Sequence, residues 1–201
     1  CTDIPTLQAR GVDVRFFGGC GFVHFPDENL EDAVRNAINK PFGQILRMDL
    51  VGVEFTTLNT FPGRISDLTG LEFATDLIAL DLSGNRVRDI SPLAGLTNLA
   101  TLHFAHIEVS DISSIAGLTN LTTLDFHSNQ VRDISALVTN KGLHSGDSVR
   151  LEDNPLNHSA LCFDIPTLEA RGVDIWYDGT CVITVPGTIG LKQAAAESAI
   201  L

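Results

Sequence analysis

The chain has 201 residues, of which 44% are hydrophobic and 19% are charged, and its formal net charge is −12 at pH 7. These values are typical of a globular protein, and no apolar run is long enough to span a membrane. Nucleic-acid binding needs a basic surface, so the low number of lysines and arginines, 13 in all, argues against a nucleic-acid partner. A basic protein surface or a divalent cation suits an acidic chain better.

The first residues of the chain, "CTDIPTLQARGVDVRFFGGC" at 1–20, are nearly repeated as "CFDIPTLEARGVDIWYDGTC" at 162–181. The two segments agree at 13 of 20 positions and contain all 4 cysteines of the chain, with equal spacing. This regularity favours two local disulfide bonds, Cys1–Cys20 and Cys162–Cys181. A zinc site is the alternative, but the C-x₂-C spacing is absent.

The cysteines also bear on the compartment. Disulfide bonds form in oxidising surroundings, so we expect an extracellular or cell-surface location. A cysteine at position 1 would also suit a lipoprotein, although Cys1 already has a counterpart inside the chain at Cys162. Pairing is therefore the preferred interpretation.

The next segment, "FPDENLEDAVRNAINKP" at 25–41, predicts a helix. Asp27 is placed to cap its first turn, and Pro41 would end it. One apolar stripe would face the rest of the protein: Leu30, Val34, Ala37 and Ile38.

The middle of the chain repeats with a period of 22 residues. "LIALDLSGNRVRDISPLAGLTN" from Leu77, "LATLHFAHIEVSDISSIAGLTN" from Leu99 and "LTTLDFHSNQVRDISALVTN" from Leu121 follow one another. Residues 55–76 keep the same register, and "SVRLEDNPL" at 148–156 continues it after an insertion of three residues. A fixed period of this size predicts a solenoid, here of about five coils, in which each coil buries its apolar residues against its neighbours.

Each L-x-L pair predicts a short strand with both leucines pointing inward. The asparagines that follow, Asn85, Asn129 and Asn154, would satisfy backbone groups buried in the turn. Gly63 and Ile107 replace this asparagine in two coils, where we expect local irregularity.

A second polar position recurs every 22 residues, at Asp67, Asp89, Asp111 and Asp133. Capping of the following helical turn would supply hydrogen-bond donors to each carboxylate. A calcium-binding edge is the alternative, which requires ligands that converge on one ion.

Residues 162–181 predict a helix followed by a strand. Asp164 and Pro166 would start the helix, and Gly172 would end it. The alternating "VDIWY" at 173–177 predicts the strand, with Trp176 in the core and Tyr177 at its edge.

These repeats resemble the bacterial leucine-rich repeat family of the internalin-like, 22-residue type. The resemblance covers about residues 55–156 and implies an α/β solenoid, with short parallel strands on the concave face, 3₁₀ or short helical turns on the convex face, and a cap at each end. It divides the chain into the C-terminal cap of a preceding repeat array (1–20), a helical N-terminal cap (21–45), the repeats (46–160), a Cys-bounded C-terminal cap (161–181) and a tail without an assigned role (182–201).

The resemblance also implies that ligands bind the outward residues beside each L-x-L pair. The expected ligand-binding residues are Asn59, Phe61, Asp81, His103, Asp125, His127, Arg150 and Glu152. Asp81, His103, Asp125 and His127 offer metal-ligand chemistry, but side chains on a flat array of strands converge poorly on one ion. We therefore expect no metal, no cofactor and no catalytic residue.

Two functions remain in view. The first is a secreted or surface module that binds a protein or another macromolecule through its concave face, without catalysis. The second is a structural unit that associates head to tail in a fibre or surface layer, which the duplicated terminal segment favours. An enzymatic role would depend on the Asp–His cluster alone.

Overall fold

The computed structural model describes residues 21–52, 57–59 and 64–182, and for Thr57 and Asn59 it describes the backbone alone. Within these residues, six short parallel strands form one sheet in the order β1-β2-β3-β4-β5-β6. The strands are β1 (Thr57–Asn59), β2 (Ala79–Asp81), β3 (Thr101–His103), β4 (Thr123–Asp125), β5 (Ser148–Arg150) and β6 (Asp174–Trp176). The sheet order follows the chain order, as in a solenoid.

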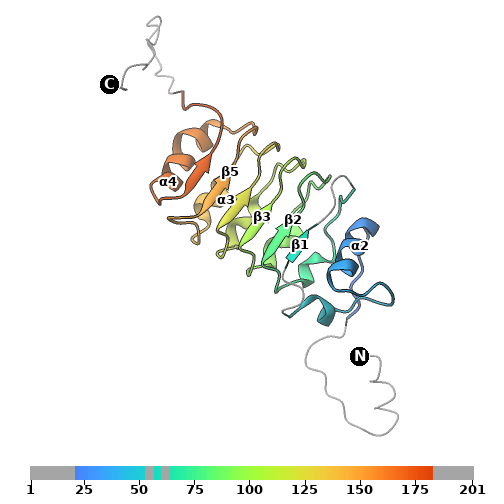
Figure 1. Ribbon diagram of the computed structural model, residues 1–201. Coiled ribbons are helices and arrows are strands. Elements are labelled where there is room, and N and C mark those ends of the chain that lie inside the picture. The colour runs from blue at the N-terminus through green and yellow to red at the C-terminus, as the bar shows by residue number, and fades with distance from the viewer. Residues whose placement is uncertain (1–20, 53–56, 60–63, 183–201) are drawn as a thin grey trace, which may run out of the picture.

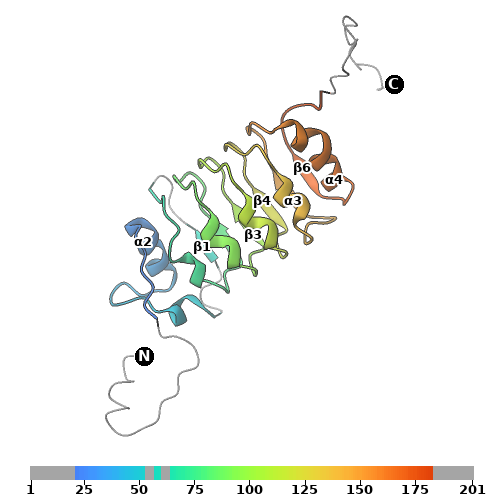
Figure 2. The ribbon, with the colours of Figure 1, turned by 180° about the vertical axis from the view of Figure 1, so that it is seen from behind.

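Short helices lie on the other side of the coils from the strands, and α2 and α4 lie at opposite ends of the elongated molecule (Figures 1 and 2). The α-helices are α2 (Glu28–Ala37), α3 (Ser135–Thr139) and α4 (Ile165–Glu169). The 3₁₀ helices are η1 (Arg47–Leu50), η2 (Leu71–Phe73), η3 (Ser91–Gly95) and η4 (Ser113–Gly117), and η5 (Ala160–Asp164) is a π-helical turn that runs into α4. Among the described residues, no helix is long and apolar enough to cross a membrane.

The inward side chain at the centre of each strand stacks on its counterpart in the next coil. Leu80 pairs in register with Leu102, Leu102 with Leu124, and Leu124 with Val149. All four side chains are at most 1% exposed. Phe104 and Phe126 extend this core with an edge-to-face contact, their ring centroids 5.6 Å apart. The 22-residue period therefore places one apolar row inside the solenoid, and the predicted fold is confirmed.

The buried asparagines join neighbouring coils. Asn129 accepts a hydrogen bond from the Val109 amide (3.1 Å) and donates to the carbonyls of Phe104 (2.6 Å) and Phe126 (3.0 Å). Asn85 and Asn154 make the corresponding bonds in their coils. These side chains pair backbone groups that the tight turn leaves without strand partners.

The coil in which Ile107 replaces this asparagine is regular, so the predicted irregularity there is wrong. Ile107 is 3% exposed and packs in the core, and the next residue keeps the bond between coils, from the Glu108 amide to the Val87 carbonyl (3.3 Å). His106 adopts the same left-handed conformation as its counterpart Ser128, with φ of 55° and 56°. An apolar side chain fits because the Leu82 and Phe104 carbonyls, which an asparagine here would bond, already accept from Asn85 and Asn129. Gly63 lies outside the described residues.

The recurring aspartates cap the turns that follow them, as predicted. The carboxylates of Asp67, Asp89, Asp111 and Asp133 each accept a hydrogen bond of 2.8 Å from the amide two residues later. The Ser113 and Ser135 amides thereby lower the pKa values of Asp111 and Asp133. These hydrogen bonds account for the aspartates without a bound cation.

The insertion before β5 is accommodated by α3 and the chain that follows it. Asn140 is buried and donates to the carbonyls of Ile115 and Leu118, both at 3.0 Å, which ties the insertion to the preceding coil. Gly142 then passes so close to this coil that an added Cβ would lie 1.8 Å from the Thr119 carbonyl oxygen. The close approach of the two backbone segments therefore requires a glycine at position 142.

At the N-terminal end, α2 packs its apolar stripe against the first coil. Leu30 and Val34 are fully buried, and Ala33 and Ile38 are partly buried against the core. Ala37, which the sequence analysis placed in this stripe, is exposed. Leu30, Val34 and Ile38 keep their predicted positions, and Ala33, one turn before Ala37, is the fourth member of the stripe.

The C-terminal helix starts earlier than predicted, and Asp164 lies inside it. Helical structure begins at His158, where the Asn157 side chain accepts a hydrogen bond from the Ala160 amide (2.8 Å). Pro166 has no amide hydrogen to donate, and the π-helical turn immediately before it absorbs the irregularity. A disulfide bond joins Cys162 in this turn to Cys181, with the Cα atoms 4.9 Å apart. Cys1 and Cys20 lie outside the described residues.

Candidate binding face

The outward side chains of the strands form one continuous surface, which we call the strand face. It is the side that the sequence analysis expected to be concave. Because side chains alternate along a strand, the residues on either side of each buried leucine or valine point outward. The central column of this face follows the strand register: Asp81, His103, Asp125, Arg150 and Trp176.

A second column lies two residues further along each coil and contains Ser83, Ala105, His127 and Glu152. Ala105 is 6% exposed, so this column is interrupted there. The Asn59 backbone pairs in register with Asp81, but the side chain of Asn59 and the whole of Phe61 lie outside the described residues.

Trp176 belongs to the strand face, and its predicted position in the core is wrong. Its side chain is 48% exposed, whereas Tyr177 packs against the core. β6 pairs Trp176 with Arg150, and the Leu151 amide donates to the Trp176 carbonyl (2.7 Å). In "VDIWY" the alternate residues Val173, Ile175 and Tyr177 turn inward. Strict alternation would have found Trp176 from the sequence.

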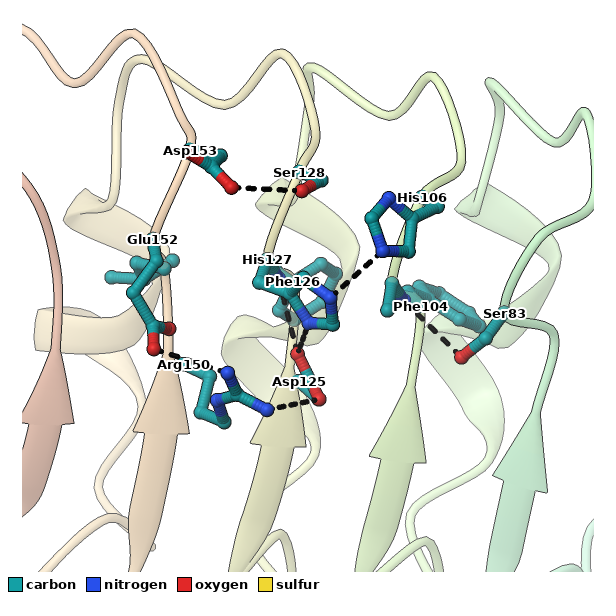
Figure 3. A network of polar contacts seen from close by, with 12 residues as sticks. Ser83, Phe104, His106, Asp125, Phe126, His127, Ser128, Arg150, Glu152 and Asp153 are labelled. Carbon is teal, nitrogen blue, oxygen red and sulfur yellow. Dashed lines mark hydrogen bonds and ion pairs between the residues drawn. The ribbon is translucent and has the colours of Figure 1, made fainter.

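A charged network crosses β4 and β5 (Figure 3). Arg150 donates to Asp125 Oδ2 (3.4 Å) and to Glu152 Oε1 (3.1 Å). Glu152 and then Asp125 raise the pKa of the Arg150 guanidinium by stabilising its charge. Asp125 Oδ1 also lies 2.6 Å from His127 Nδ1 and accepts from the His127 amide (3.1 Å). Opposite charges thus meet across neighbouring strands.

The network includes His106, which is not among the binding residues expected from the sequence. The Nε2 atom of His106 lies 3.0 Å from that of His127, and the two rings stand almost perpendicular, at 83°. His106 occupies a turn with φ of 55°, a conformation in which histidine is enriched. His106 occupies the same turn position as Gly84, Ser128 and Asp153 of the other coils, and this position is the signal that could have placed it beside the next coil.

The other members of the expected Asp–His cluster, Asp81 and His103, precede this network in the strand register. Asp81 accepts a hydrogen bond from the Ser83 amide (2.9 Å), and His103 lies between Asp81 and Asp125 in the strand register. Within the part of the chain that the structure describes, no group of three or more His, Cys, Asp or Glu side chains is arranged to hold a metal ion. An Asp–His pair can activate a nucleophile for acyl transfer when the histidine contacts a hydroxyl or thiol group. In this structure the Nε2 atom of His127 contacts the imidazole of His106 instead.

A shallow cleft of about 240 Å³ lies away from the strands, beside η4 and α3. It is lined by Ser110, Asp111, Ser113, Asp133, Ser135 and Ala136. Its two carboxylates already accept hydrogen bonds from the backbone amides that they cap. The cleft is therefore part of the capping structure of the coils.

The parallel sheet in chain order, the leucine rows and the short helices define a leucine-rich repeat fold. A family model described as "Leucine Rich repeats (2 copies)" matches residues 97–139. The chain is similar to the crystal structure of an internalin from Listeria monocytogenes, at 25% identity and a TM-score of 0.60 over 66% of this chain and 45% of that one. It is also similar to a leucine-rich repeat protein of Leptospira interrogans, at 22% identity and a TM-score of 0.52 over 60% of this chain and 30% of that one.

The chain thus matches less than half the length of either solved relative. No curated protein sequence matches it significantly. The similarities support a leucine-rich repeat fold, and leucine-rich repeat domains generally mediate protein–protein interactions.

Proposed function

We propose that this protein is an extracellular or cell-surface binding module that captures a protein partner on its strand face, without catalysis. The observation that carries the proposal is the central column of the strand face, where Asp81, His103, Asp125, Arg150 and Trp176 stand on adjacent strands in strict register. The sheet holds these side chains on a rigid surface, so little conformational entropy is lost when a partner binds.

The chemistry of the strand face suits a protein partner. Trp176 is a half-exposed aromatic side chain next to an arginine, and tryptophan and arginine are enriched among the residues that dominate binding energies. The acidic groups Asp81, Asp125 and Glu152 would favour basic groups on the partner and speed its approach. The candidate residues Asn59 and Phe61 would extend the same face at its N-terminal end.

The extracellular location rests on the Cys162–Cys181 disulfide bond, because such bonds persist in oxidising compartments. We also propose that residues 21–45 and 161–181 act as the two caps of the repeats at 46–160. In support, α2 covers the core of the first coil through Leu30 and Val34, and β6 completes the sheet at the other end. Without these elements, the apolar cores of the first and last coils would be open to association.

Surface capture experiments with a panel of purified matrix and cell-surface proteins would test the binding proposal. We expect Asp81→Lys, Arg150→Glu and Trp176→Ala each to weaken capture of a partner by about tenfold or more. Arg86→Glu and Glu169→Lys change exposed charges outside the strand face and should leave capture unchanged. Trp176 is the only tryptophan of the chain, so its fluorescence should also change on binding. Equal effects from both sets of variants would reject the strand face as the site.

Self-association is a second candidate function, which the near repetition of residues 1–20 at 162–181 favours. Exposed apolar side chains lie near both ends of the described structure: Phe22 and Phe42 at one end, Phe163 and Val182 at the other. Light scattering over a range of concentrations should then show head-to-tail polymers, which Phe163→Ser would shorten. A monodisperse monomer at high concentration would reject this candidate.

A further inference from the structure

The contact between His106 and His127 differs from the other polar contacts of the strand face. Around it, carboxylates pair with a guanidinium, an imidazole or backbone amides, whereas here two imidazoles present their Nε2 atoms to each other at 3.0 Å (Figure 3). Imidazole nitrogen is a preferred ligand of first-row transition metals. We propose that His106 and His127 form a binding site for a divalent transition-metal ion, which the two Nε2 atoms coordinate.

His127 is oriented for this role by Asp125. The carboxylate only accepts hydrogen bonds, so the 2.6 Å contact places the proton of a neutral His127 on Nδ1 and leaves the lone pair on Nε2. Carboxylates commonly orient metal-binding histidines in this way. Asp125 is itself held by the His127 amide and by Arg150. The first ligand is therefore fixed before any ion arrives.

His106 supplies the second ligand from an exposed turn. In the absence of an ion, the contact is a hydrogen bond from His106 Nε2–H to the His127 lone pair. When an ion binds, the proton of His106 moves to its own Nδ1, and a rotation of the ring directs both lone pairs at the ion. No net proton is released from the neutral pair.

The spacing of the two nitrogens indicates which ions fit. With metal–nitrogen bonds of about 2.0–2.1 Å, two ligands lie about 2.9 Å apart at a right angle and about 3.3 Å apart at the tetrahedral angle. The observed 3.0 Å lies between these two values. Because the exposed His106 ring rotates when an ion binds, the pair can reach either spacing and suits the ions that imidazole prefers, which include Cu²⁺, Ni²⁺ and Zn²⁺. Water would fill the remaining positions, since the described side chains offer no third ligand.

Calorimetric titration with Ni²⁺ tests the site, on protein without a polyhistidine tag and in a buffer that does not chelate metals. We expect one Ni²⁺ ion per chain at pH 7.5. His106→Asn and His127→Gln should each abolish the binding. Asparagine tolerates the left-handed turn at position 106, so the fold should persist. Asp125→Asn should weaken binding by about tenfold, because it removes the charged partner of His127.

His103→Gln is the matched control, because it removes a histidine of the same face that is outside the pair. Full affinity in His106→Asn, or an equal loss in His103→Gln, would overturn the proposal. Nuclear magnetic resonance of the imidazole nitrogens in the unmodified chain gives a second measurement that needs no variant. Ni²⁺ should broaden the Nε2 signals of His106 and His127 first, and broadening of other histidines alone would count against the site.

Discussion

Asp27 connects the N-terminal helix to the first coil of the solenoid through the two oxygens of one carboxylate. Oδ1 accepts from the amides of Asn29 (2.9 Å) and Leu30 (3.2 Å) and so caps α2. Oδ2 accepts from the amide of Ser66 (2.7 Å), 39 residues further along the chain. The side chain is only 8% exposed, so these hydrogen bonds form away from solvent. One residue therefore performs both a local and a long-range function.

Asp27→Ala should lower the free energy of unfolding by about 3 kcal/mol, because it removes a helix cap and leaves the Ser66 amide without its charged acceptor. Chemical denaturation followed by circular dichroism would measure the loss. Asp32→Ala removes an exposed carboxylate from the same helix and should change stability by less than about 0.5 kcal/mol. Similar losses in both variants would show that the long-range bond contributes little.

The contribution of Asp27 also depends on pH. Burial raises the pKa of this carboxyl, but the hydrogen bonds, with that from the Ser66 amide foremost, outweigh burial and lower the pKa below its ordinary value of 3.8. The stabilisation is thus complete above pH 3.8 and is lost as the pH falls through the lower folded-state pKa. The difference between Asp27→Ala and the unmodified chain should shrink in this acid range.

Asn129 gives a second prediction, because its 1% exposed side chain joins two coils through three backbone groups. Asn129→Ala would take this partner from the buried Val109 amide and Phe104 carbonyl, whereas the Phe126 carbonyl still accepts from Asn154 (2.8 Å). The variant should cost about 3 kcal/mol of unfolding free energy. Asn120→Ala removes an exposed asparagine that makes a single bond to the Thr97 carbonyl, and should cost about 0.5–1 kcal/mol. Denaturation curves of the two variants would contradict this account if their midpoints shifted equally.

The sequence predicted those features that repeat from coil to coil. A period of 22 residues with leucines at fixed offsets leaves one arrangement that buries them all, and Leu80, Leu102 and Leu124 lie in that row. The capping aspartates followed from the same repetition, since one local pattern serves each coil. The C-terminal helix lies outside the repeats. There the Asp164–Pro166 pattern predicted the wrong start, because the helix begins earlier, where Asn157 accepts a hydrogen bond from its first turn.

The strand face was predictable in register but not in its contacts. Asp125, His127, Arg150 and Glu152 are brought together because long side chains reach across neighbouring strands. His106 joins them through a left-handed turn and a rotamer that the sequence does not specify. The contacts of a surface network depend on such choices, whereas the buried row depends on apolarity alone.

Asp164→Asn should stabilise the protein at neutral pH. Burial, followed by repulsion from Asp133, raises the pKa of Asp164, so its ionised form is disfavoured in the folded state. The cost is present above the raised pKa and vanishes below the ordinary value of 3.8, where the carboxyl is protonated in both states. We expect a gain of a few tenths of a kcal/mol at pH 7 that disappears by about pH 3.

Asp133→Asn is the informative comparison for this prediction. This variant also relieves the repulsion with Asp164. However, it removes the negative charge of the carboxylate that accepts a hydrogen bond from the Ser135 amide, and this hydrogen bond lowers the pKa of Asp133. This variant should therefore lose stability at neutral pH. If the unfolding temperatures of Asp164→Asn and Asp133→Asn at pH 7 shifted in the same direction, the environments assigned to Asp164 and Asp133 would be contradicted.

Gly142 provides a steric test of how the insertion packs on the preceding coil. Its φ is outside the left-handed region, so alanine is allowed by the backbone. The obstacle is the Thr119 carbonyl, whose oxygen would lie 1.8 Å from the new Cβ. Because this contact involves backbone atoms, one segment must move, and Gly142→Ala should cost about 1–3 kcal/mol.

Gly117→Ala is the matched control, because an added Cβ there meets no atom within 4 Å. It should change the unfolding free energy little or raise it by about 0.4–1 kcal/mol, since alanine restricts the unfolded chain. Hydrogen exchange would locate the damage in Gly142→Ala: the Asn140 side chain holds the insertion on the carbonyls of Ile115 and Leu118, so amides of α3 and η4 should lose protection first. An unchanged midpoint for Gly142→Ala would mean that the insertion can lift from the preceding coil at little cost.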